Sequence, residues 1–236
     1  AFLPSPAMAA RRRPAAAARR PAPKSVRRQL LKRPSAAGAV GARRPLFLLA
    51  PGASNQPSPP VRACLERWGD VREFVYPGKG TPNLFGRRAE CIGTHLSALE
   101  AAAASARGRP IWLAGVSFGS RCAAELLGDK AAALPRTVMG LIAFGYPLVA
   151  LGDQKEPDPR KRKQDRSKPL LALPASRRVL LISSERDPFL GGDGGKELRR
   201  IAQRMTAPCS AALLGGSSHN PVTPRGVDQI HAALEA

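Results

Sequence analysis

PIWLAGVSFGSRCAAE, residues Pro110 to Glu125, is the stretch that decides the fold. Its apolar run from Ile111 to Ala114 predicts a buried strand, and the small residues and helix formers after Gly119 predict a helix. Between them a sharp turn carries Ser117 at its apex. Gly115 and Gly119 flank this serine, where strand and helix must pass within contact distance. The stretch therefore predicts a strand, a tight turn and a helix that present a serine hydroxyl.

Strands and helices are predicted to alternate on both sides of this stretch. Further strands are expected at Leu46–Ala50, Val71–Tyr76, Val138–Phe144, Arg177–Ser184 and Ser210–Gly215, and further helices at Val61–Trp68, Arg87–Ala106, Lys196–Met205 and from Thr223 to about Leu234. The charged, proline-broken residues 151–169 are expected to form a mobile surface excursion. This alternation predicts an α/β fold, a mostly parallel sheet of about six strands with helices on both faces.

The first 44 residues differ in composition from the rest of the chain. They contain 12 of the 38 Lys and Arg residues and no Asp or Glu, and prolines interrupt any long helix. We expect residues 1–44 to be disordered and residues 45–236 to form one folded domain. An Arg-rich, acid-free start is typical of a transit peptide to a plastid or mitochondrion. Without a transit peptide, the protein would be cytoplasmic or nuclear. The alternative is a basic arm that binds nucleic acid or an anionic surface.

Composition also excludes several classes of protein. No stretch approaches the roughly 20 consecutive apolar residues that a membrane span requires. The four cysteines are widely spaced, without a C-x-x-C pair, which argues against a zinc site and a disulfide framework and favours reduced, partly buried thiols. We expect no cofactor and no metal. We do not expect residues 45–236 to bind nucleic acid, since over half of the +21 charge lies in residues 1–44. The oligomeric state stays open.

A serine hydroxyl is a weak nucleophile and needs a base that an acid orients. Among the three histidines, His95 falls within a long helix as a packed or partly exposed residue, and His231 falls on the last helix, where we expect it to be exposed. His219 instead follows a predicted strand in a loop of small residues. For the acid, Glu185, Asp187 and Asp193 all follow the strand at 177–184, and Asp187 is preferred because Pro188 fixes a tight turn there.

The order Ser117, Asp187, His219 along the chain is the order that α/β hydrolases use. An oxyanion hole would need two N–H donors near Ser117. We expect one from Phe118, which opens the helix after the serine, and one from Ala53, in the loop after the first strand. Pro51 in that loop has no N–H to offer.

Three segments of the chain resemble one group of α/β-hydrolase-like proteins. They are Gly115–Ala124 (GVSFGSRCAA), Gly140–Leu148 (GLIAFGYPL) and Val179–Phe189 (VLLISSERDPF), and the resemblance covers about Leu46 to Leu234. The group includes testis-expressed hydrolase-like proteins, a hydrolase-like subunit of a chromatin acetyltransferase complex and bacterial dienelactone-hydrolase-like proteins. The resemblance implies Ser117 as nucleophile, Asp187 as acid and His219 as base.

The chain departs from the group's pattern in two loops. After the first strand the group commonly has His-Gly-Ala-Gly, where this chain reads Pro51-Gly52-Ala53-Ser54. At the histidine the group commonly has Gly-Asp-His, where this chain reads Ser217-Ser218-His219. The first difference affects the loop expected to complete the oxyanion hole. The second affects the residues next to His219, the expected base.

Two functions follow from these observations. The first is a serine hydrolase that acts on a small ester, thioester or lactone; a small substrate is favoured because residues 149–175 are the only insertion after the fourth predicted strand. The alternative is a non-catalytic module of the same fold, whose basic segment from Arg160 to Lys168 docks an acidic protein partner. A hydrogen bond between Ser117 and His219 beside an open pocket would favour the enzyme, and a filled pocket would favour the module.

Overall fold

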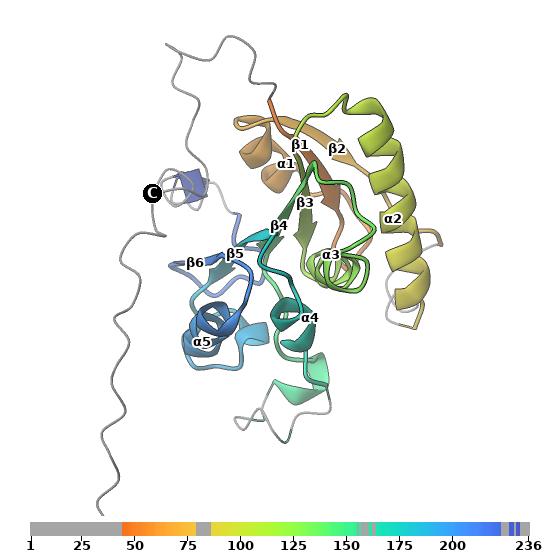
Figure 1. Cartoon of the computed structure of the whole chain (residues 1–236). Coiled ribbons are helices and arrows are strands. Elements are labelled where there is room, and N and C mark those ends of the chain that lie inside the picture. The colour runs from red at the N-terminus through yellow and green to blue at the C-terminus, as the bar shows by residue number, and fades with distance from the viewer. Residues whose placement is uncertain are drawn as a thin grey trace, which may run out of the picture.

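A six-stranded parallel sheet forms the centre of the molecule in a computed structural model, with the strand order β2-β1-β3-β4-β5-β6 (Figure 1). The structure describes residues 44–78, 86–154, 156, 161, 164–222, 227–228 and 230–231. The strands are β1 Leu46–Ala50, β2 Asp70–Glu73, β3 Ile111–Val116, β4 Val138–Phe144, β5 Arg178–Ser184 and β6 Cys209–Leu214. The helices are α1 Pro59–Glu66, α2 Arg88–Ser105, α3 Phe118–Asp129, α4 Lys168–Leu171 and α5 Lys196–Arg204, with 3-10 turns η2 Leu151–Asp153 and η4 Pro188–Leu190. The predicted α/β fold is confirmed.

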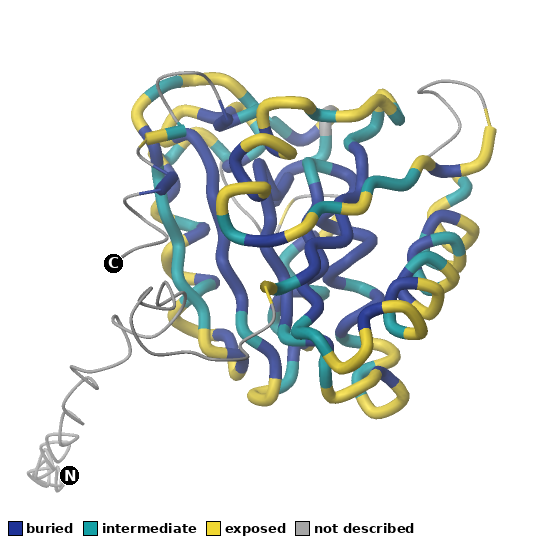
Figure 2. Tube along the Cα trace, turned by 90° about the horizontal axis from the view of Figure 1, so that it is seen from above, coloured by how far each residue is buried: buried dark blue, intermediate teal, exposed yellow. Residues whose placement is uncertain are grey.

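Helices cover both faces of the sheet. On one face, alternate strand residues such as Leu48 and Leu113 pack against α2, α3, α4 and α5. On the other face, Phe47 and Trp112 pack against α1 and against helical residues near the end of the chain, including Ile230. Because β1, β3, β4 and β5 are buried on both faces, they are apolar through most of their length, although β5 begins with Arg178 and ends with two buried serines, Ser183 and Ser184. Figure 2 shows these buried strands in the middle of the molecule and the exposed residues on the outer sides of the helices.

Strand β2 is shorter than the sequence predicts because the chain leaves the sheet after Glu73. The backbone of Tyr76 pairs instead with the side chain of Asn55, whose Oδ1 accepts from Tyr76 N–H and whose Nδ2 donates to Tyr76 C=O, both at 2.8 Å. Tyr76 is thereby buried beside the loop that follows β1. The contact ties together two loops at the same edge of the sheet.

Two expectations about exposure are wrong. His231 is only 5% exposed, because its ring stacks on Trp68 and its Nδ1 accepts a hydrogen bond of 3.1 Å from Trp68 Nε1. The segment 151–169 is not simply a surface excursion, since Asp153 and Arg166 are buried. The sequence does not show the contact with Trp68 that covers His231 or the hydrogen bond to the carbonyl of Val149 that holds Arg166 inside the molecule.

Some expectations concern residues outside the described part of the chain. These are the basic segment up to residue 43, the loop at 79–85, residues 160, 162 and 163 of the basic segment from Arg160 to Lys168, and much of the predicted final helix. Arg44 is described, and its guanidinium donates to the carbonyl of Glu66 at 2.7 Å. All four cysteines are free thiols, with Cys64, Cys91 and Cys122 buried. No helix in the described ranges is both long and apolar enough to cross a membrane.

Candidate active site

Ser117 lies between the end of β3 and the start of α3, at the carboxyl edge of the sheet. Its backbone has φ 48° and ψ −111°, a conformation that residues with a side chain rarely adopt. Ser117 N–H donates to the carbonyl of Phe144 at 2.8 Å, and Ser120 Oγ donates to the carbonyl of Ser117 at 2.6 Å. The serine is therefore held at the apex of a tight turn, as the sequence predicts.

The two flanking glycines are required by close packing. A Cβ on Gly115 would lie 2.5 Å from the backbone nitrogen of Ser120 in α3. A Cβ on Gly119 would overlap the carbonyl oxygen of Pro51 and lie 2.9 Å from the Cβ of Ala50. Both positions exclude any larger residue because the obstacles include backbone, which cannot rotate away. The loop after β1, the strand β3 and the helix α3 thus meet at the serine.

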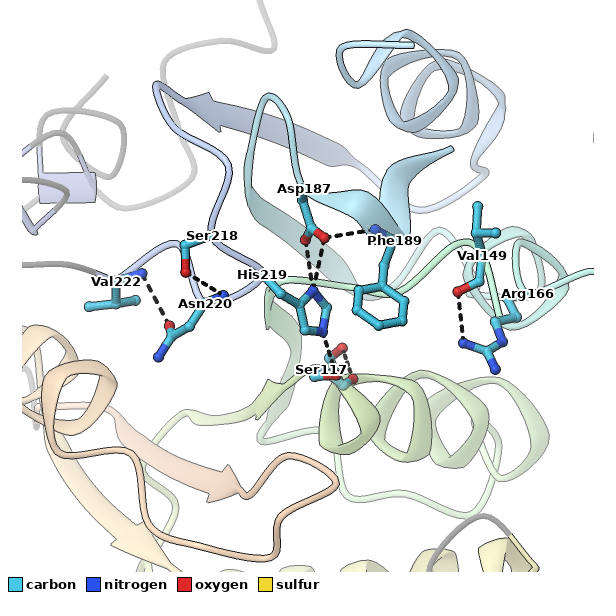
Figure 3. A network of polar contacts seen from close by, with 10 residues as sticks. Ser117, Val149, Arg166, Asp187, Phe189, Ser218, His219, Asn220 and Val222 are labelled. Carbon is cyan, nitrogen blue, oxygen red and sulfur yellow. Dashed lines mark hydrogen bonds and ion pairs between the residues drawn. The ribbon is translucent and has the colours of Figure 1, made fainter. Parts of the chain in front are cut away.

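Asp187, His219 and Ser117 form one hydrogen-bonded chain (Figure 3). His219 Nδ1 lies 2.8 Å from Asp187 Oδ2 and 3.0 Å from Oδ1, and His219 Nε2 lies 2.7 Å from Ser117 Oγ. A carboxylate can only accept, so Nδ1 carries the proton and Nε2 accepts from the serine hydroxyl. The three residues follow β5, β6 and β3, whose carboxyl ends share one edge of the sheet. The topology therefore brings together residues that are far apart in the chain.

The acid and the histidine differ in exposure. Asp187 is buried, whereas the side chain of His219 is 27% exposed. The Asp187 carboxylate is fixed from a second direction, because Phe189 N–H donates to its Oδ1 at 2.8 Å. The site thus has a shielded acid and an imidazole that is partly exposed to solvent.

Phe189 and Gly145 also shape the site, and sequence reasoning did not assign them a role there. The Phe189 ring lies against the His219 ring, with 4.3 Å between the ring centroids. Gly145, at φ 61°, follows β4, and a Cβ on it would overlap the carbonyl oxygen of His219. The available signals were an aspartate before a proline, which typically caps a short turn, and a glycine directly after a strand.

The two residues expected to form an oxyanion hole come from α3 and from the loop after β1, both of which lie beside Ser117. Phe118 is the first residue of α3, and its buried ring packs edge-on against Tyr76 at a centroid distance of 5.8 Å. Ala53 belongs to a turn in which Asn55 N–H donates to the carbonyl of Gly52 at 2.9 Å. A Cβ on Gly52 would lie 3.8 Å from the Cβ of Ser117, so this turn passes directly beside the serine.

The other histidines lie elsewhere. His95 is fully buried in α2, and His231 packs against Trp68. Within the described residues, no group of three or more His, Cys, Asp or Glu side chains is arranged to hold a metal ion.

The fold and this serine, histidine and aspartate together define the class of protein, an α/β-hydrolase-type domain. The chain belongs to the family described as alpha/beta hydrolase domain, whose model matches residues 78–231. The match includes Ser117, Asp187 and His219. No curated protein matches the chain.

Several solved structures share the fold at low sequence identity. An alpha-beta serine hydrolase homologue from Coxiella burnetii is 14% identical, with a TM-score of 0.55 over 89% of this chain and 87% of that one. A dienelactone hydrolase from Anabaena variabilis is 14% identical, with a TM-score of 0.56 over 83% and 86%. A thermostable carboxyl esterase from Bacillus coagulans is 12% identical, with a TM-score of 0.59 over 83% and 92%. At such identities the likeness concerns the fold.

Proposed function

We propose that the protein is a serine hydrolase that cleaves a small ester, thioester or lactone through Ser117, His219 and Asp187. The observation that carries the proposal is the hydrogen-bonded chain from the Asp187 carboxylate through both ring nitrogens of His219 to Ser117 Oγ. In this arrangement the base lies within hydrogen-bond reach of the nucleophile, and the acid fixes the tautomer of the base. The fold likeness to a dienelactone hydrolase and a carboxyl esterase is consistent with this chemistry.

The proposed reaction has two halves. Ser117 Oγ attacks the substrate carbonyl while His219 Nε2 takes its proton, and the Asp187 carboxylate stabilises the imidazolium that forms. The resulting oxyanion would accept hydrogen bonds from the N–H groups of Phe118 and Ala53. His219 then gives the proton to the leaving alcohol or thiol, which leaves an acyl-serine. Water attacks this acyl group with His219 as the base, which releases the acid and restores Ser117.

The non-catalytic interaction module remains the second reading of the sequence. It would not require Ser117 and His219 to be hydrogen-bonded or the imidazole to be partly exposed. The distance of 2.7 Å between His219 Nε2 and Ser117 Oγ, with the His219 side chain 27% exposed, therefore favours the enzyme. Within the family, we propose a place near the testis-expressed and chromatin-complex hydrolase-like proteins, on the strength of the segments GVSFGSRCAA and GLIAFGYPL.

Labelling with a fluorophosphonate probe tests the proposal directly. The wild-type chain should be labelled, because the probe reacts with a serine that a neighbouring base activates. Ser117→Ala should abolish the labelling. Ser218→Ala is the matched control. Ser218 lies next to His219, and among the described residues its hydroxyl accepts a hydrogen bond from Asn220 N–H alone, so the variant should leave labelling unchanged. A folded wild type that is not labelled, or a Ser117→Ala variant that still is, contradicts the proposal.

A further inference from the structure

A second site, away from Ser117, is suggested by a cavity of about 470 Å³. The cavity lies between α3, α4 and the start of α2, and its basic lining residues are Arg88, Arg121, Arg166 and Lys168. None of the residues of the Ser117–His219–Asp187 chain lines it. Its volume is within the range of pockets that hold small organic ligands, roughly 300–1,000 Å³.

Arg121, on the first turns of α3, is a buried charge with little compensation. The residue is 5% exposed. Among the described residues its one ion pair joins Nη2 to Glu125 Oε1 at 3.6 Å, which is longer than a hydrogen bond. Its Nε has no hydrogen-bond partner among the described residues. A buried guanidinium normally needs both a counter-charge and hydrogen bonds, so Arg121 has a distant counter-charge and one unsatisfied N–H.

Arg166 presents a second buried guanidinium to the same cavity. It is held in place because Nη1 donates to the carbonyl of Val149 at 3.0 Å, a bond that Figure 3 shows, and Nε donates to Gln164 at 3.2 Å. Burial, followed by the positive charge of Arg121, lowers the pKa of Arg166 to about 10. The two cations are thus close enough to repel each other.

The carboxylates that line the cavity do not remove this repulsion. Glu125 is shared, since its Oε2 also pairs with Arg88 Nε at 3.0 Å. Asp165 Oδ1 accepts from the backbone N–H and the hydroxyl of Ser167, and Asp129 is exposed. The charge of Asp153 raises the pKa of Arg166 and so offsets part of the repulsion, but it does not restore the pKa to its usual value. An additional anion would therefore find the unsatisfied Nε of Arg121 beside the positive charge of Arg166.

We propose that this cavity binds the phosphate group of a small phosphorylated molecule between Arg121 and Arg166. A phosphate offers several acceptor oxygens, which suits two guanidinium groups that approach from different elements. Arg88 and Lys168 are more exposed and line the approach to the cavity. The space beyond the phosphate accommodates the organic part of the ligand. The site is independent of the proposed hydrolase reaction.

Thermal unfolding of the full chain with inorganic phosphate as the probe tests the site. Phosphate should raise the Tm in a saturable way compared with chloride at equal ionic strength, because a ligand that binds only the folded state stabilises it. Arg121→Met keeps the side-chain stem and removes the charge, so the phosphate-dependent rise should disappear. Arg67→Met, which removes an exposed cation at the end of α1 on the other face of the sheet, should keep the rise. The basic N-terminal segment is the same in every variant and cannot produce the difference.

The proposal is overturned if phosphate does not raise the Tm of the wild type. It is also overturned if phosphate raises the Tm of Arg121→Met by the same amount. Selenate-soaked crystals of the wild type provide a readout that needs no variant. An anomalous peak between the guanidinium groups of Arg121 and Arg166 supports the site. Peaks only elsewhere on the surface, or none, overturn it.

Discussion

His219 and His95 show how differently one fold can use the same side chain. Both ring nitrogens of His219 are hydrogen-bonded, one to Asp187 and one to Ser117, and part of the ring is accessible. His95 in α2 is fully buried, neither of its ring nitrogens has a partner among the described residues, and its ring packs against Phe74. Partners with opposite hydrogen-bonding roles make an imidazole suitable for proton transfer, whereas burial alone makes it a packing residue.

The largest expected effect comes from removing each imidazole in turn. His219→Ala should lower the rate of hydrolysis of a nitrophenyl ester by about 10⁴-fold or more, because the serine loses its base. His95→Leu should leave that rate unchanged, since His95 touches none of the reacting groups. Circular dichroism would verify that both variants are folded. A folded His95→Leu variant that has lost activity would break the comparison.

The next largest effect is on the pH dependence of the free energy of unfolding, and it comes from His95. Burial lowers its pKa from 6.5 to about 3, so between these values the unfolded chain binds a proton that the folded chain does not. Stability is therefore complete above pH 6.5 and falls with decreasing pH, by up to about 1.4 kcal/mol per pH unit from this group. Denaturant unfolding at pH 7, 5 and 4 should show a shallower loss for His95→Leu. Identical slopes in the two proteins would disprove this assignment.

The smallest effect concerns the ring that covers His219. Phe189→Leu removes the aromatic contact but keeps the backbone N–H that donates to Asp187. We expect kcat to fall by about two- to tenfold with little change in KM, because an aromatic ring stabilises a neighbouring imidazolium. Phe189→Tyr retains the ring and should stay close to the wild-type rate. If Leu and Tyr behave alike, the ring serves only as packing.

Much of the fold could be predicted because the apolar runs in the sequence coincide with the strands that are buried in the sheet. Apolar runs such as Val138–Phe144 became strands with the same bounds, since strands buried on both faces need apolar residues throughout. The three residues of the hydrogen-bonded chain could be selected because a parallel sheet gathers the loops after its strands at one edge. Their catalytic role remains a prediction.

What the sequence did not predict depends on contacts between distant residues. The exposure of His231 was predicted wrongly because Trp68, which covers it, lies 163 residues earlier. Arg166 was assigned to a surface segment, yet the carbonyl of Val149 holds its side chain inside the molecule. The end of β2 depends on Asn55, 21 residues before Tyr76. A pattern along the chain cannot show which partner arrives from elsewhere.

The backbone of Ser117 has a consequence for the balance between folding and chemistry. Glycine would adopt φ 48° and ψ −111° readily, whereas a residue with a side chain is destabilised there by about 1–3 kcal/mol. A domain optimised for stability alone would thus carry glycine at this position. The chain instead places a hydroxyl at a site where folding disfavours any side chain, and Gly115 and Gly119 are already present to allow the turn. Ser117 therefore lowers the stability of the folded domain relative to glycine. This cost supports the hypothesis that Ser117 is the nucleophile, and the support does not depend on His219.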